Sequence, residues 1–132
     1  MVRPHILVVD DTRAVADMLS DTLDSLGYEP EIALGGRSAI TSFESRRPAG
    51  VLLDIRMPGM EGPEVLAELH RIDPTVPVII VTGTWDQVSA RALLKAGAFD
   101  LVHKPVDREY LALALSAALG GTPGDLPTPE VA

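Results

Sequence analysis

Short apolar runs alternate with segments of helical periodicity along this chain, and this alternation limits the possible folds more than any other feature. The clearest apolar runs are His5–Val9, Val51–Leu53 and Val76–Val81. Unbroken runs of this kind are typical of parallel strands that are buried on both faces of a sheet. Strands that alternate with helices form a parallel sheet with helices on both faces. The pattern therefore predicts an α/β fold.

The expected elements follow from the apolar spacing and the turn residues. Strands are expected at His5–Val9, Tyr28–Ala33, Val51–Leu53, Val76–Val81 and Leu101–His103. Helices are expected between Thr12 and Gly27, between Gly36 and Pro48, between Pro63 and Asp73, from about Asp86 to Ala96, and from Asp107 to about Leu119. Pro30 lacks a backbone donor, so the second strand is expected at an edge of the sheet.

Side-chain types refine the helix predictions. Thr12 and Asp107 are expected to cap the first and last helices, because each carries an acceptor oxygen just before a helical segment. Met18 is expected in the apolar stripe of the first helix. Gly27 and Gly97 are expected to end the first and fourth helices.

Length and composition indicate one domain followed by a tail. The 132 residues suffice for a single hydrophobic core. Residues 120–132 contain three prolines and three glycines and little apolar surface, so they are expected to be a flexible tail or linker. The domain is therefore expected to span residues 1–119.

The absence of cysteine excludes disulfides and thiolate metal sites. No window approaches the roughly 18–20 uncharged residues of a membrane span, and the first residues do not form a secretory signal. These features favour a cytoplasmic protein. The formal charge of −8 argues against direct binding of nucleic acid or anionic lipid, so the expected partners are basic surfaces or a cation.

Four of the expected strands end in reactive groups: Asp10 and Asp11, Asp54, Thr82, and Lys104. Taken singly, these residues are ordinary helix caps, turn residues or solvated charges. Because the carboxyl ends of parallel strands meet at one edge of a sheet, we expect the groups to form one site. The conjunction of three carboxylates, a hydroxyl and an ammonium is the specific signal.

The charges of this predicted site indicate a divalent cation and phosphate chemistry. Three aspartates and one lysine sum to −2, so either a cation joins the clustered carboxylates or their pKa values rise. A divalent ion with oxygen ligands resolves this conflict. Magnesium prefers such oxygen ligands and brings phosphate with it, whereas zinc would favour His or Cys. Asp54 could then attack phosphorus, with Lys104, Thr82 and the amides of Arg56 and Gly83 stabilising the phosphoryl oxygens. No histidine or glutamate is an evident base for rapid hydrolysis of the acyl phosphate. The slowly lost phosphoryl group would therefore act as a switch.

The sequence resembles the receiver domain of the two-component response-regulator family from about Arg3 to Leu119. The resemblance rests on five stretches: Leu-Val-Val-Asp-Asp at 7–11, Leu-Leu-Asp-Ile-Arg-Met-Pro-Gly-Met-Glu-Gly at 52–62, Val-Thr-Gly at 81–83, Lys-Ala-Gly-Ala at 95–98 and Lys-Pro at 104–105. It implies a flavodoxin-like, doubly wound sheet of five parallel strands in the order 2-1-3-4-5.

The resemblance also implies a role for each site residue. Asp54 would accept a phosphoryl group from a histidine kinase or a histidine phosphotransfer protein. Asp11, Asp54 and the backbone carbonyl of Arg56 would bind Mg²⁺, with Asp10 assisting largely through water. Thr82 would be the switch hydroxyl, and Lys104 would pair with the phosphoryl group. The Lys104–Pro105 bond is expected to be cis.

Two features of this chain bear on its output. Many family members carry an aromatic residue three positions before the lysine, and this chain has Leu101 there. Signalling would then rely on Thr82 and loop displacement. In the last helix, Tyr110, Leu113 and Ala117 form a second apolar stripe, which we expect to be a self-association or effector face. The alternative is an alanine-rich exposed surface.

Two other functions are compatible with the fold. An aspartate-nucleophile phosphohydrolase would want a second carboxylate two residues past Asp54, where this chain has Arg56. A receiver fold could also act as a scaffold without phosphorylation, although every acceptor-site residue is present. The leading interpretation is a phosphorylation-controlled module that catalyses only its own phosphorylation and dephosphorylation and is not a turnover enzyme.

Overall fold

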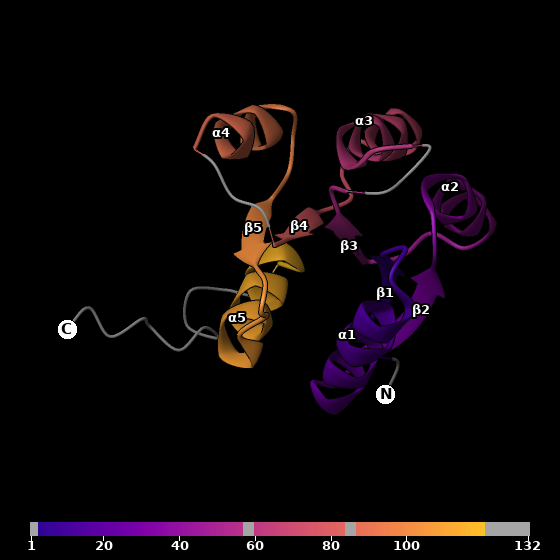
Figure 1. The fold of residues 1–132 in the computed structure, drawn as a ribbon. Coiled ribbons are helices and arrows are strands. Elements are labelled where there is room, and N and C mark those ends of the chain that lie inside the picture. Colours follow the sequence, from indigo (N-terminus) through magenta and orange to yellow (C-terminus); the bar gives the residue numbers. More distant parts are fainter. Residues whose placement is uncertain (1–2, 57–59, 84–86, 121–132) are drawn as a thin grey trace.

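A computed structural model of the chain describes residues 3–56, 60–83 and 87–120. Strands and helices alternate throughout (Figure 1). In chain order the elements are β1 (His5–Val9), α1 (Arg13–Ser25), β2 (Glu29–Ala33), α2 (Gly36–Ser45), β3 (Gly50–Asp54), α3 (Gly62–Ile72), β4 (Val78–Thr82), α4 (Gln87–Lys95), β5 (Asp100–His103) and α5 (Arg108–Ala118). The predicted tail, apart from Gly120, lies outside the described residues.

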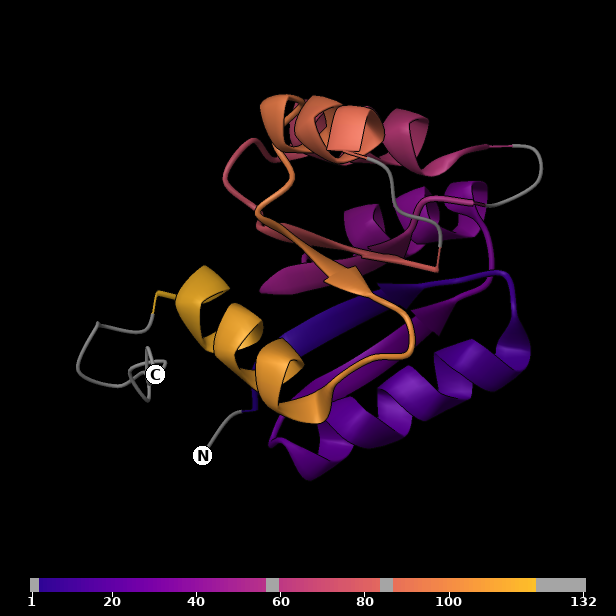
Figure 2. The same ribbon diagram turned by 60° about the vertical axis from the view of Figure 1, so that its left-hand side comes forward.

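The strands form one parallel sheet in the order β2-β1-β3-β4-β5, as the resemblance implied. The strand that contains Pro30 lies at an edge, as predicted. Helices α1 and α5 cover one face of the sheet, and α2, α3 and α4 cover the other (Figures 1 and 2). The sheet is therefore doubly wound and buried on both faces.

The core consists of two clusters, one on each face of the sheet. Alternate residues of a strand belong to opposite clusters: Leu7 and Val9 pack on the α2–α4 side, and Ile6 and Val8 pack on the α1–α5 side. Because both sets of side chains are buried, β1 carries no polar alternation. This is the physical reason for the unbroken apolar runs.

Several element ends agree with the predictions. Asp107 caps α5, because its carboxylate accepts hydrogen bonds from the amides of Glu109 and Tyr110. Gly27 and Gly97 follow α1 and α4 with φ values of 95° and 111°, which side chains rarely adopt. The fourth helix begins at Gln87, and Asp86, where we expected its start, lies outside the described residues.

Three local predictions were wrong or incomplete. Met18 is 46% exposed, because the buried stripe of α1 runs through Ala16, Leu19 and Leu23. Thr12 occupies the N-cap position of α1 but makes no side-chain capping bond. The fourth strand begins at Val78 instead of Val76, because the chain turns at Asp73 and the Val76 amide donates to the Asp73 carbonyl.

Candidate functional site

The predicted strand-end residues lie at one edge of the sheet. Asp10 follows β1, Asp54 and Thr82 end β3 and β4, and Lys104 follows β5. These four strands are consecutive neighbours in the sheet, so their carboxyl ends lie side by side. The parallel topology thus brings together groups that are 94 residues apart in the sequence, as in the contact between Lys104 and Asp10.

Three carboxylates form a compact cluster at this edge. Asp10, Asp11 and Asp54 each place one oxygen so that these atoms lie within 4.8 Å of one another. Asp10 is fully buried, Asp54 is 7% exposed, and Asp11 is exposed. Clustered carboxylate oxygens with one side open to solvent are the donor set that a hydrated Mg²⁺ ion prefers. The residues present therefore fit this metal.

Lys104 is the cation that faces the two buried carboxylates. Its Nζ lies 3.2 Å from Asp10 Oδ2 and 3.6 Å from Asp54 Oδ2. Its side chain is 24% exposed, so the lysine is only partly buried. The Lys104 amide donates to the Thr82 carbonyl at 2.8 Å, which fixes β5 against β4 at this point. The Lys104–Pro105 bond is cis, as predicted.

Backbone amides orient both buried carboxylates in the same way. Asp10 Oδ1 accepts from the amide of Thr12 at 2.9 Å, and Asp54 Oδ1 accepts from the amide of Arg56 at 3.2 Å. In each carboxylate the other oxygen, Oδ2, faces Lys104. The aspartates are thus held in place by the loops that follow their strands, and one oxygen of each is presented to the shared space.

Burial raises the pKa of Asp54 above its ordinary value of 3.8. The hydrogen bond from the Arg56 amide opposes this rise in pKa. The negative charge of Asp10 adds to it, Lys104 opposes it, and Asp11 adds to it further. The site therefore imposes an electrostatic cost on the ionised Asp54 that an added cation would relieve.

Thr82 and Gly83 border the lysine. Thr82 is 2% exposed at the end of β4. Gly83 is exposed, and a Cβ at this position would lie 3.8 Å from Lys104 Cβ. The hydroxyl and the amide that were predicted to contact phosphoryl oxygens therefore belong to the strand end beside Lys104.

Leu101 lies in the core on the α2–α4 side and is 6% exposed. It packs in the same cluster as Leu93 of α4 and Ala98. The position three residues before Lys104 is therefore filled by a buried aliphatic side chain.

Sequence reasoning missed the close packing of Gly62 behind the end of β3. A Cβ at Gly62 would lie 2.4 Å from the Cα of Ile55, and the Gly62 amide donates to the Ile55 carbonyl at 3.0 Å. Residue 62 must lack a side chain so that α3 can begin directly against the residue after Asp54. No neighbouring residue in the sequence signals this contact, since the partner of Gly62 is set by the fold.

Gly62→Ala is expected to destabilise the protein by about 2–3 kcal/mol, because the new methyl group would overlap backbone atoms. Urea unfolding would measure this loss. Gly50→Ala is the matched control, since a Cβ there has ordinary contacts of 3.5 Å or more. Equal stability of the two variants would contradict the packing argument.

Comparison with known proteins gives consistent matches. The sequence model described as the response regulator receiver domain matches residues 6–116. The regulatory protein AtoC of Escherichia coli strain K12 is 40% identical over 115 residues, which cover 87% of this chain and 25% of AtoC. The response regulator MprA of Mycolicibacterium vanbaalenii is 41% identical over 122 residues, which cover 92% of this chain and 52% of MprA.

Solved structures agree with the sequence matches. A response regulator receiver domain protein from Clostridium thermocellum superposes with a TM-score of 0.84 at 30% identity, covering 88% of this chain and 94% of that chain. The chemotaxis protein CheY4 of Vibrio cholerae gives 0.84 at 28% identity, covering 89% and 100%.

The chain spans between a quarter and about half of the length of the curated relatives cited above. None of the helices that the structure describes has the length and apolar character needed to cross a membrane.

Proposed function

The chain belongs to the response regulator receiver domain family of two-component systems, and from this premise we propose that Asp54 accepts a phosphoryl group in a Mg²⁺-dependent reaction. Receiver domains act as signalling modules, bind Mg²⁺ at an acidic pocket and work with histidine kinases. The proposed function of this chain is a switch whose state is the phosphorylation of Asp54. The donor is a phosphohistidine of a kinase or of a phosphotransfer protein.

The observation that carries this proposal is the contact of Lys104 with two buried carboxylates beside Asp11. The ammonium lies within 3.6 Å of both Asp10 Oδ2 and Asp54 Oδ2. A phosphoryl group on Asp54 would lie next to the fixed positive charge of Lys104. Such preorganised charge is the main requirement of phosphoryl transfer.

Each residue has a separate part in the transfer. A carboxylate oxygen of Asp54 attacks phosphorus, a new P–O bond forms, and the bond from phosphorus to the donor nitrogen breaks with its electron pair left on the imidazole. Lys104 pairs with a phosphoryl oxygen. The amide of Gly83 and the Thr82 hydroxyl donate hydrogen bonds to the other phosphoryl oxygens. The Arg56 amide, which donates to Asp54 Oδ1 before transfer, would donate to a phosphoryl oxygen after it.

We assign the metal ligands to Asp10, Asp11, Asp54 and the backbone carbonyl of Arg56, with Asp10 acting largely through water. Mg²⁺ held there would neutralise the carboxylates and the transferred phosphoryl group. The raised pKa of Asp54 supports this assignment, because a cation relieves the cost of ionising a buried carboxylate.

The proposed switch responds through Thr82 and the loops at the carboxyl edge. Thr82 is buried at the end of β4, and its carbonyl accepts the Lys104 amide. Movement of the threonine toward a phosphoryl group would therefore displace the β4 end relative to β5. With Leu101 already buried, this route does not involve an aromatic residue at position 101.

A phosphohydrolase is a poorer fit to the same geometry. Residue 56 donates its backbone amide to Asp54, and its side chain is a guanidinium, which cannot act as a general base. Steady release of phosphate from a phosphomonoester would favour the hydrolase.

The test of the proposed function is phosphoryl uptake from acetyl phosphate, followed by intact-mass measurement. The full chain is expected to gain the mass of one phosphoryl group when Mg²⁺ is present. A chelator added before the phosphodonor should prevent the gain. No mass gain with Mg²⁺ and excess donor would reject the function, and the scaffold interpretation would then replace it.

We further propose that Tyr110, Leu113 and Ala117 of α5 form a face for self-association or an effector. Tyr110 is 45% exposed, and its hydroxyl donates to Asp100 Oδ2 at 2.9 Å, which holds the ring at the β5 edge. Leu113 and Ala117 are partly exposed on the same helix.

Leu113→Arg is expected to weaken this association about 30-fold, because a charge would be buried at the centre of an apolar contact. Sedimentation of the phosphorylated protein, or effector binding, would measure the effect while phosphoryl uptake stays intact. Ala67→Arg, on the exposed side of α3, is the matched control. Unchanged association in both variants would leave the alanine-rich exposed surface as the correct interpretation.

A further inference from the structure

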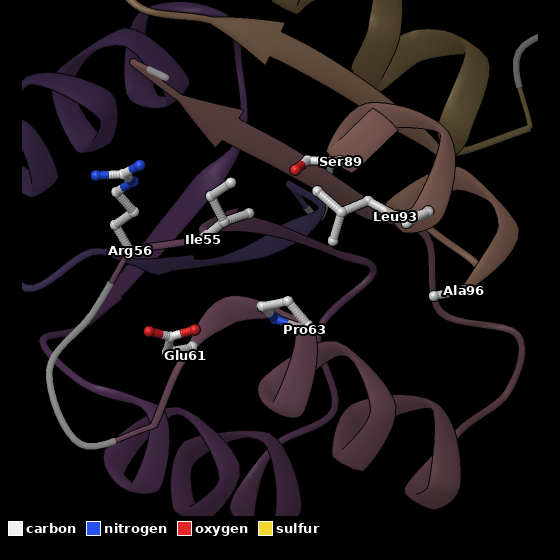
Figure 3. A pocket seen from close by; sticks show the side chains of 8 residues that line it. Ile55, Arg56, Glu61, Pro63, Ser89, Leu93 and Ala96 are labelled. Atoms are coloured by element: carbon white, nitrogen blue, oxygen red, sulfur yellow. The ribbon is translucent and has the colours of Figure 1, made fainter. Parts of the chain in front are cut away.

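A groove lies between α3 and α4, on the sheet face opposite α1 and α5 (Figure 3). Its volume of about 780 Å³ is in the range of small-molecule sites. Leu93 of α4, which is 5% exposed, and the partly buried Ile55 form an aliphatic floor. Ala92 of α4, Ala96 directly after α4 and Pro63 of α3 form the walls. The groove would therefore hold an apolar body of modest size.

Two opposite charges lie at one end of this groove. Arg56 and Glu61 occupy the same end in Figure 3, and the side chains of Leu93 and Ala96 lie toward the other. Among the residues that the structure describes, the guanidinium of Arg56 and the carboxylate of Glu61 form no hydrogen bond or ion pair. Both charges are exposed, so both are available to a ligand.

We propose that this groove binds a large apolar α-amino acid. The ligand carboxylate would pair with the Arg56 guanidinium, which can donate two parallel hydrogen bonds to it. The ligand ammonium would donate to Glu61, and the side chain would cover Ile55 and Leu93. This assignment uses both rim charges and the aliphatic floor, and it does not depend on phosphorylation of Asp54.

Other small ligands match the groove less well. Among the described lining residues, a phosphate ester would meet one arginine, Arg56, with Glu61 beside it, in a chain with a net charge of −8. A simple carboxylic acid would leave Glu61 beside a second anion. A zwitterion adds no net charge and gives both Arg56 and Glu61 a partner of opposite charge. It is therefore the ligand class that these two charges favour.

The proposed ligand would rest on the loop that holds the acceptor aspartate. The Arg56 amide donates to Asp54 Oδ1, and the Ile55 carbonyl accepts the Gly62 amide. Residues 55, 56 and 61 therefore belong both to the groove and to the segment behind Asp54. An occupant would contact this segment without covering Asp54.

The test is an amide chemical-shift titration of the full chain with L-phenylalanine. Saturable shifts are expected at Ile55, Ser89 and Ala96, with a dissociation constant on the order of 0.1–1 mM. Phenylalaninamide lacks the carboxylate and 3-phenylpropionate lacks the ammonium, so each is expected to bind about tenfold more weakly. Equal binding of all three, which would indicate a purely apolar groove, would overturn the proposal.

Variants separate the site from general hydrophobic binding. Arg56→Gln and Glu61→Gln are each expected to weaken phenylalanine binding about tenfold. Arg91→Gln and Glu64→Gln change exposed charges outside the groove and are expected to leave phenylalanine binding unchanged. Ala92→Trp should fill the groove and abolish binding, with its fold checked by thermal unfolding. No saturable shift in the wild-type protein, or shifts at another face, would reject the site.

Discussion

Asp54→Asn is expected to abolish phosphoryl uptake from acetyl phosphate. The amide nitrogen and oxygen of asparagine do not provide the carboxylate nucleophile that forms an acyl phosphate. The neighbouring carboxylates do not replace it: Asp10 is fully buried and paired with Lys104, and Asp11 lies on the exposed side of the cluster. Intact-mass measurement with Mg²⁺ and excess donor should show only the unmodified variant.

The same substitution is expected to stabilise the Mg²⁺-free protein at neutral pH. The folded state holds the pKa of Asp54 above its ordinary value of 3.8, mainly through burial. An acid with a raised folded pKa binds protons more tightly when folded, so its ionisation lowers stability as pH rises through that interval. The uncharged asparagine avoids this loss, and a gain of about 0.5–2 kcal/mol is expected.

The stability gain of Asp54→Asn is expected to increase with pH. The stability difference between Asp54→Asn and wild type should be largest above the raised pKa and should disappear below about pH 3.8, where the wild-type carboxyl is protonated in both states. Urea unfolding with a chelator at several pH values would measure it. Asp17→Asn, at an exposed position of α1, is the control. Phosphoryl uptake by Asp54→Asn equal to that of the wild type would refute Asp54 as the acceptor.

Lys104→Ala is expected to have the second-largest effect. Its removal would leave Asp10 and Asp54, both buried, without the ammonium that lies within 3.6 Å of each. Unpaired buried charges are costly, so the Mg²⁺-free protein should lose about 1–3 kcal/mol of stability. The rate of phosphoryl uptake should fall on the order of 10²-fold, because a fixed positive charge at the transferred group is lost.

Two measurements separate the effect of Lys104 from a general loss of fold. Added Mg²⁺ should restore much of the stability of Lys104→Ala, since the cation supplies positive charge to the same carboxylates. Lys95→Ala removes the other lysine of the chain, which lies exposed in the last turn of α4, and should change neither stability nor uptake. Wild-type uptake by Lys104→Ala would remove the lysine from the proposed mechanism.

Much of the fold could be predicted from the chain because its signals are local. The apolar run of β1 and the edge position of Pro30 follow from burial and from a missing backbone donor. The Asp107 cap needs only an acceptor and two amides nearby in sequence. The meeting of Asp10, Asp54 and Lys104 followed from one added rule, that parallel strands end at a common edge.

Other features could not be predicted because they depend on distant partners. The exposure of Met18 depends on how α1 is rotated against the sheet. The groove beside Arg56 depends on the spacing between α3 and α4, which no residue of either helix encodes alone. The requirement for glycine at position 62 depends on Ile55, whose backbone lies against Gly62 only in the folded chain.

The sequence by itself determined the order of strands and helices along the chain, the reactive groups at four of the strand ends and the charge imbalance among these groups, because these depend on residue type and spacing along the chain. Only the tertiary structure decided which oxygen of each aspartate faces Lys104, that burial raises the pKa of Asp54, and that Gly62 lies against Ile55. Those properties arise from atoms that folding brings together across the sheet, and distance and desolvation have no counterpart in a linear chain.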